Sequence, residues 1–89
     1  MICGEGNGVN GIKEYYSLVV AVLDEDGNRI NSEEIVGSNN KEIIYSNRKE
    51  LDNEIASGKY DRLKKDKHIL LSEIEVYDND TNELLYIIL

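Results

Sequence analysis

Residues 15–28 read YYSLVVAVLDEDGN, and this stretch decides the fold. Residues 15–23 are almost all aromatic, β-branched or aliphatic, so both faces of an extended chain would be apolar there. An edge strand with one solvated face would alternate apolar and polar residues instead. The stretch therefore predicts a central strand that ends at Asp24.

The next segment, Asp24 to Asn28, predicts a tight reversal of the chain. Asp and Asn tolerate left-handed backbone conformations, and Gly27 adopts a positive φ without steric cost. We expect this turn to lead into a second, antiparallel strand over residues 29–36. Residues 37–40 (GSNN) predict another turn, and the apolar residues 43–45 (IIY) after it are interpreted as an optional short strand.

A helix of about three turns is predicted to follow the optional strand. Ser46 or Asn47 can cap its start, and Asn47 with Glu50 has the spacing of a capping box. A serine–glycine pair after residue 56 supplies the stop. The apolar stripe is narrow, with Leu51 and Ile55 as its i, i+4 pair, so the helix must lie on a sheet to be stable.

Two further strands complete the predicted domain. Residues 68–77 and 83–89 are strongly β-forming, and the polar residues 78–82 (DNDTN) between them predict a hairpin loop. Because LLYIIL runs to the last residue, we expect the C-terminal strand to be buried. The order β-β-(β)-α-β-β predicts an α+β fold, an antiparallel sheet of four to five strands with one helix packed on it. Residues 13–89 form this single domain, and residues 1–12, rich in glycine, are interpreted as a flexible arm.

Charge and composition exclude several functional classes. Eighteen acidic against ten basic residues give a net charge of -8, which would repel nucleic acid and an anionic membrane surface. One Cys and one His allow neither an intramolecular disulfide nor a four-ligand zinc site. No apolar run approaches the roughly 20 residues that span a bilayer. We therefore expect a cytoplasmic protein with no cofactor, no metal and no membrane partner.

Codons for the abundant Asn, Lys, Ile and Tyr are AT-rich, which suggests a low-GC bacterium or its phage.

Motifs of catalytic or ligand-binding chemistry are weak. Residues 6–11 (GNGVNG) match G-x-G-x-x-G but have no preceding strand, and a strand rather than a helix follows. Residues 78–82 open like a calcium loop, but the required Gly and the closing Glu are absent. His68 and Ser72 share one strand about 13–14 Å apart, too far for a hydrogen bond. These patterns predict a protein that is not an enzyme.

The remaining signal is the distribution of acidic residues. Residues 59–67 (KYDRLKKDK) hold five of the ten basic residues, which leaves the rest of the chain strongly acidic. Carboxylates gather in the two predicted hairpin turns and along two strands. If both turns lie at the same end of the sheet, these carboxylates would form rows that a basic groove could accept in place of phosphates. The candidate partner-binding residues are Asp24, Glu25, Asp26, Glu33, Glu34, Glu73, Glu75, Asp78 and Asp80.

The basic stretch itself has two interpretations. It can dock onto an acidic patch of a second copy, which would give a homodimer. Alternatively it is an exposed loop with Tyr60 and Leu63 tucked beneath it, and we favour this loop.

The chain matches no family by motif, but its profile is similar to that of small phage-encoded inhibitors of bacterial defence, such as anti-CRISPR and anti-restriction proteins. That resemblance covers length, acidity and the lack of proline and of catalytic signatures. It implies a non-catalytic inhibitor that occupies the basic nucleic-acid-binding surface of a defence effector in the bacterial cytoplasm. Two alternatives remain. One is an assembly module that forms a homo-oligomer through its sheet, and the other is a small-ligand sponge or enzyme with a pocket at a dimer interface.

Overall fold

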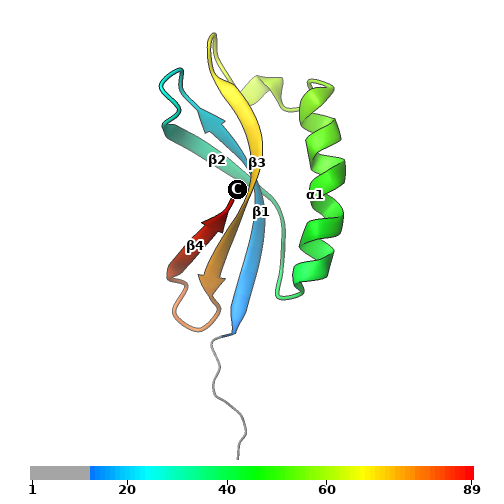
Figure 1. Ribbon diagram of the computed structural model, residues 1–89, viewed down its shortest axis with the longest axis vertical. Helices are drawn as coiled ribbons and strands as arrows, with labels where there is room; N and C mark the ends of the chain where they lie inside the picture. Colours follow the sequence, from blue (N-terminus) through cyan, green and yellow to red (C-terminus); the bar gives the residue numbers. More distant parts are fainter. Residues whose placement is uncertain (1–12) are drawn as a thin grey trace, which may run out of the picture.

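The computed structural model describes residues 13–89 (Figure 1). The expected flexible arm, residues 1–12, lies outside the described residues. Four strands and one α-helix form an α+β fold, which confirms the predicted class. The elements are β1 (Glu14–Leu23), β2 (Arg29–Ser38), α1 (Lys41–Ala56), the short 3₁₀ helix η1 (Asp61–Leu63), β3 (Ile69–Asp78) and β4 (Leu84–Ile88).

All four strands are antiparallel and lie in the order β2-β1-β3-β4. The apolar β1 is therefore a central strand, as its sequence predicts. It pairs with β3 along its whole length, from Glu14 opposite Asp78 to Leu23 opposite Ile69. The sheet is strongly twisted, and α1 lies across one face of it (Figure 1).

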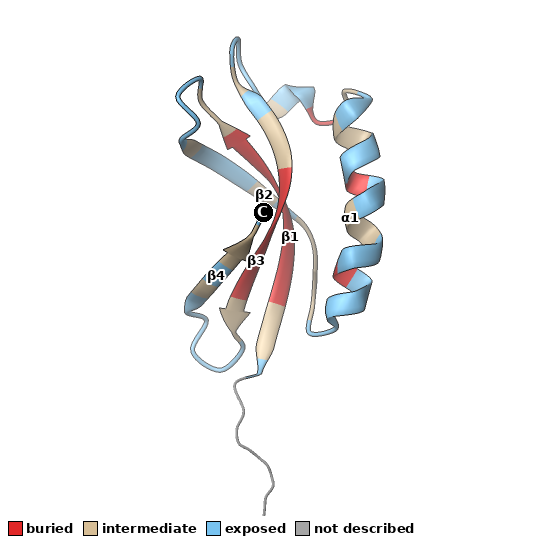
Figure 2. Ribbon diagram, in the orientation of Figure 1, coloured by how far each residue is buried: buried red, intermediate tan, exposed pale blue. Residues whose placement is uncertain are grey.

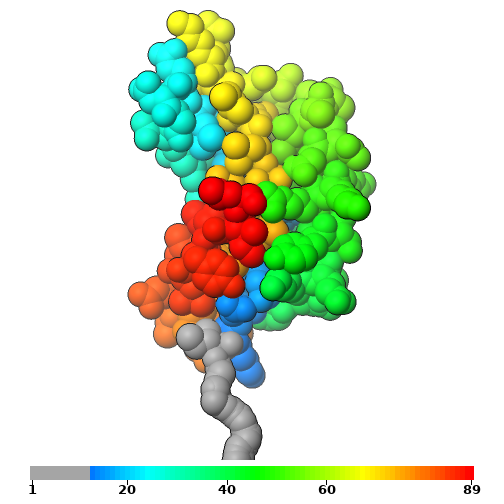
Figure 3. Space-filling view, in the orientation of Figure 1, coloured from blue at the N-terminus to red at the C-terminus, as the bar shows by residue number. Residues whose placement is uncertain are grey.

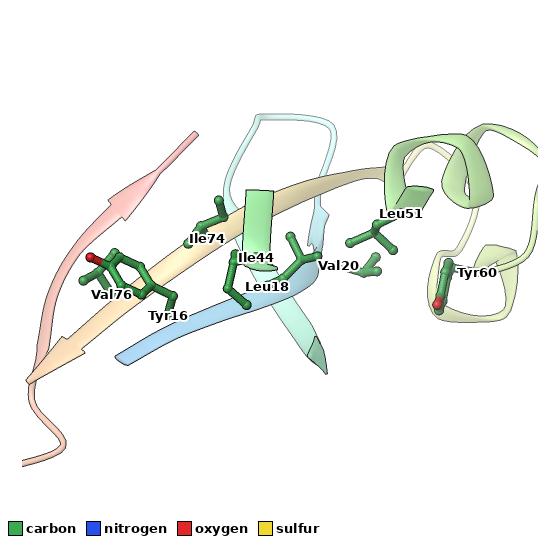
Figure 4. Packing of buried hydrophobic residues seen from close by; sticks show 8 residues of the cluster. All are labelled: Tyr16, Leu18, Val20, Ile44, Leu51, Tyr60, Ile74 and Val76. Atoms are coloured by element: carbon green, nitrogen blue, oxygen red, sulfur yellow. The ribbon is translucent and has the colours of Figure 1, made fainter. Parts of the chain in front are cut away.

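The hydrophobic core lies between α1 and that face of the sheet (Figure 2). Alternate residues of β1 and β3 point toward the helix, as the two-residue period of a strand requires. Isoleucine and leucine side chains of α1 meet them. Figure 4 shows the buried cluster of Tyr16, Leu18, Val20, Ile44, Leu51, Tyr60, Ile74 and Val76.

The prediction for the start of the helix is wrong, because α1 begins six residues before Asn47. Asn40 is the N-cap, and its side-chain oxygen accepts a hydrogen bond from the Glu42 N–H at 2.9 Å. Residues 43–45 are therefore helical and form no strand. Ile44 is fully buried while the apolar residues beside it are exposed, so one helical face points at the sheet. The predicted cap Asn47 lies inside the helix, where its side chain donates to the Ile43 carbonyl.

Both hairpin turns form where the sequence predicts them. In the first, an Asp24 carboxylate oxygen accepts hydrogen bonds from the N–H groups of Asp26 (3.0 Å) and Asn28 (2.8 Å). Gly27 has a φ of +87°, which an L side chain rarely adopts. These backbone hydrogen bonds hold the pKa of Asp24 below its usual value, chiefly through the Asn28 N–H.

The expectation of a buried C-terminal strand is wrong. β4 is an edge strand, and Leu84, Tyr86 and Leu89 are exposed, the last at 83%. The reason is geometric, because α1 packs against β1, β2 and β3. The outer edge of β4 has no cover among residues 13–89.

Candidate partner-binding surface

The sheet separates the predicted acidic residues instead of collecting them in one row. The β1–β2 turn lies at one end of the sheet and the β3–β4 turn at the other (Figure 1). The register requires this, because Leu23 pairs with Ile69 and Glu14 pairs with Asp78 across the central strands. The hypothesis that the two turns share one end is therefore wrong.

Two of the carboxylates toward the β1–β2 end, Glu25 and Glu33, face the basic stretch, residues 59–67. Arg62 bonds Glu33 at 2.9 Å, and Lys67 lies 3.8 Å from Glu25. Tyr60 is buried and Leu63 is half-buried, as the loop interpretation of this stretch expects. At this end of the molecule the two charge signs are therefore mixed.

The glutamates of β3 lie on the sheet face opposite α1, but they are buried. Glu73 is 6% exposed and Glu75 is 9% exposed. Arg29 forms an ion pair with both carboxylates, at 3.5 Å from Nε to Glu73 and more closely from Nη2 to Glu75. The Tyr77 hydroxyl donates to Glu75 at 2.6 Å, which raises the pKa of Tyr77 to about 12. These glutamates bind an internal guanidinium.

Two further candidate residues, Glu33 and Glu34, are neighbours on β2 but lie in different environments. Glu33 faces the basic stretch, as described above. Glu34 is exposed, and it accepts a hydrogen bond of 2.5 Å from the Ser17 hydroxyl of β1. The two neighbours therefore face different parts of the molecule, as successive residues of a strand do.

Four carboxylates gather at the β3–β4 end of the described surface. We call Glu14, Asp78, Asp80 and Glu83 the acidic end. None of the four forms an ion pair within residues 13–89. Asp80 and Glu83 are exposed, and the carboxylate of Asp78 accepts the Asp80 N–H at 2.9 Å in the turn.

Glu14 joins the acidic end only through the tertiary structure. Its carboxylate accepts hydrogen bonds from the hydroxyls of Tyr16 (2.6 Å) and Tyr86 (3.0 Å), and the first of these raises the pKa of Tyr16 to about 12. Sequence reasoning missed both Glu14 and Glu83. Glu83 could have been found from the sequence, because it directly follows the predicted acidic loop, residues 78–82. Glu14 had no local signal, since Asp78 reaches it through strand pairing.

A groove of about 770 Å³ is the second feature that sequence reasoning missed. It runs along the edge of β3 that β4 does not cover. The lining residues come from the β1–β2 hairpin, α1, β3 and the end of β4: Leu23, Gly27, Arg29, Arg48, Asp52, Ile55, Ala56, Leu70, Leu71, Ser72, Glu73, Ile87 and Leu89. The sequence contained one indication of this groove. The strand predicted over residues 83–89 is shorter than its partner over residues 68–77, so part of the partner's edge stays uncovered.

Ser72 anchors α1 to this edge. Its hydroxyl donates to Asp52 at 2.6 Å and accepts from Arg48 Nε at 3.0 Å. A second Arg48 nitrogen donates to the Ser72 carbonyl, also at 3.0 Å. His68 instead accepts the Lys65 N–H. The arrangement holds the serine oxygen between a carboxylate and a guanidinium, and it fixes the helix against the strand.

No protein-family model, curated protein or solved structure matches the chain. Within residues 13–89, no helix has the length and apolar character needed to cross a bilayer.

Proposed function

We propose that the chain is a non-catalytic binding protein whose acidic end occupies a basic surface of a partner protein. The observation that carries the proposal is the contrast between the two ends of the sheet. Glu25 and Glu33 toward the β1–β2 end form ion pairs with the basic stretch, whereas none of the four carboxylates of the acidic end has an ion pair within residues 13–89. Charges that are not neutralised internally are available to a partner.

The partner we propose is a nucleic-acid-binding effector of bacterial defence, which the chain would inhibit inside the host cell on behalf of a phage or mobile element. A basic groove built for phosphates attracts clustered carboxylates for the same electrostatic reason. The net charge of -8 adds long-range attraction to such a groove. Binding of this kind is fast and weakens as salt rises.

Charge reversal at the two ends of the sheet tests the proposal. Asp80→Lys with Glu83→Lys reverses two exposed charges at the acidic end. Glu25→Lys with Asp26→Lys reverses two exposed charges at the other end and changes the net charge equally. We expect the first variant to lose binding at least tenfold and the control to lose less than threefold.

The measurement is a tagged pull-down from a low-GC bacterial lysate with all three proteins as bait, washed at low and at high salt. A basic nucleic-acid-binding protein that wild type and the control retain, and that the acidic-end variant loses, is the expected result. Equal loss with both variants would show a response to net charge alone and would contradict the proposal. The buried Glu73 and Glu75 are unsuitable for such a test, because lysines there would lie beside Arg29 and unfold the protein.

A second candidate function is self-assembly through the sheet. The exposed apolar side chains of β4, with Leu84 and Tyr86 both 46% exposed, favour it. Light scattering would then give a stable multiple of 10.1 kDa that does not respond to salt. A monomer at micromolar concentration would rule this function out.

A further inference from the structure

The edge of β3 is only partly covered by its neighbour. β4 pairs with β3 from Ile74 onward, where Ile74 faces Ile88. Residues 69–73 pair with β1 on one side only, and on the other side residues 13–89 supply no strand. An open length of five residues corresponds to about 17 Å of strand.

The backbone groups of this open length point into the groove. In an antiparallel strand, alternate residues direct both N–H and C=O to the same side. The Ser72 carbonyl points away from β1, because it accepts from Arg48 of α1, and the groups of Leu70 point the same way. Arg48 already occupies the Ser72 carbonyl, so the edge offers an added strand the N–H and C=O of Leu70 and the N–H of Ser72.

The two walls of the groove differ in chemistry, and each complements one face of an added strand. On the α1 side the groove is lined by Ile55, Ala56 and Leu70, which accept apolar side chains. Figure 3 shows this edge, with the yellow atoms of β3 visible between the cyan β1–β2 hairpin, green α1 and the red end of β4. The incoming strand would therefore lie in line with β4.

On the opposite side the groove carries excess negative charge. Glu73 lines the groove, its side chain is 8% exposed, and its Oε1 has no hydrogen bond. The nearest cation, Arg29, is shared with Glu75. Two carboxylates thus face one guanidinium, so a lysine or arginine entering on this side would be attracted. The Arg48 and Asp52 charges on the helix side balance each other.

We propose that the open edge of β3 accepts an extended segment of a basic partner protein as a fifth strand, with cationic side chains toward Glu73 and apolar side chains toward Ile55 and Ala56. The inference rests on the proposed function for the sign of the partner's charge. The open edge of β3 is a different surface from the acidic end.

The test uses a capped six-residue peptide of alternating lysine and valine, titrated into ¹⁵N-labelled protein at physiological salt. We expect amide shifts at Leu70, Ser72 and Ala56. A peptide of the same sequence with an N-methyl group on every backbone nitrogen keeps its charge but has no N–H to donate from either edge, and it should bind at least tenfold more weakly.

Protein variants locate the binding in the groove. Ala56→Arg places a long side chain in the groove from an exposed helical position, and it should weaken peptide binding at least tenfold. Asn53→Arg, exposed on the same helix but outside the groove, is the matched control and should bind as wild type does. Glu73→Gln should weaken the lysine–valine peptide several-fold and leave a neutral threonine–valine peptide unchanged.

Three results would overturn the inference. The first is equal binding of the N-methylated peptide, and the second is a set of shifts confined to the acidic end. The third is a concentration-dependent shift of the groove amides without peptide, which would show that a second copy fills the groove. The acidic-end variant, Asp80→Lys with Glu83→Lys, tests the proposed function separately, because neither residue lines the groove.

Discussion

Arg29 holds together the polar side of the sheet. It lies at the start of β2 and reaches Glu73 and Glu75 on β3, across the central strand. Burying two carboxylates has a large desolvation cost, which the guanidinium offsets through charge-assisted hydrogen bonds. A single arginine thus allows a mostly buried strand to contain two glutamates.

Arg29→Met should destabilise the protein by about 3 kcal/mol, because two buried carboxylates lose their counter-ion. The measurement is urea denaturation at neutral pH. The matched control is Arg62→Met, which breaks the exposed pair with Glu33 and should cost less than about 1 kcal/mol.

The role of Arg29 can be checked by removing the charges that it balances. Combining Arg29→Met with Glu73→Gln and Glu75→Gln should restore most of the lost stability. If the triple variant is as unstable as Arg29→Met alone, packing of the arginine stem rather than charge is the cause.

At the scale of the element, the two edge strands of the sheet differ. β2 carries Arg29, Glu33 and Glu34 and has two irregularities in its register with β1. Charges and bulges of this kind discourage pairing with other chains. β4 has the sequence LLYII and carries no charge. Contact with another chain is therefore expected on the β3–β4 side of the sheet.

The N-cap of α1 gives a direct test of the helix boundary. Asn40→Ala should lower the free energy of unfolding by about 1 kcal/mol, because the Glu42 N–H loses its acceptor. Asn47→Ala, at the position that the sequence predicts as a cap, should be neutral or slightly stabilising, since alanine favours a helix interior. Urea denaturation of both variants measures the difference. A larger loss at Asn47 would contradict the boundary.

At the scale of the whole molecule, tyrosine–glutamate hydrogen bonds on both faces of the sheet make stability depend on alkaline pH. The pKa values of Tyr16 and Tyr77 are raised from 10.0 to about 12 by hydroxyl groups that donate to Glu14 and Glu75. The folded state holds these two protons more tightly than the unfolded chain does. Their contribution to stability is complete below pH 10 and is lost as the pH rises through about 12.

We therefore expect the urea midpoint to fall steeply above pH 10, the unshifted tyrosine pKa. Absorbance at 295 nm follows phenolate formation in the same samples. Tyr77→Phe removes one of the two protons and should make the decline shallower, whereas Tyr45→Phe, at an exposed helical tyrosine, serves as control. An equal slope in all three proteins would show that lysine titration, not the tyrosine hydroxyls bonded to glutamate, causes the loss.

The sequence by itself determined the strand-rich α+β class, the central position of β1 and both hairpin turns. These features depend on neighbouring residues, such as the apolar run before Asp24 and the positive φ of Gly27. Local signals failed for α1, because Asn47 and Glu50 imitate a capping box while burial of Ile44 against the sheet favours the earlier cap at Asn40.

Only the tertiary structure decided which carboxylates a partner can reach. The pairing of β1 with β3 puts the two acidic turns at opposite ends and buries Glu73 and Glu75 under Arg29. The pairing of β3 with β4 ends at Ile74 and Ile88, which leaves the edge of β3 open beyond that point. Charge is a property of each residue, but exposure and counter-ions depend on residues distant in the chain. For that reason composition predicted an acidic protein, and only the fold located its acidic end and its groove.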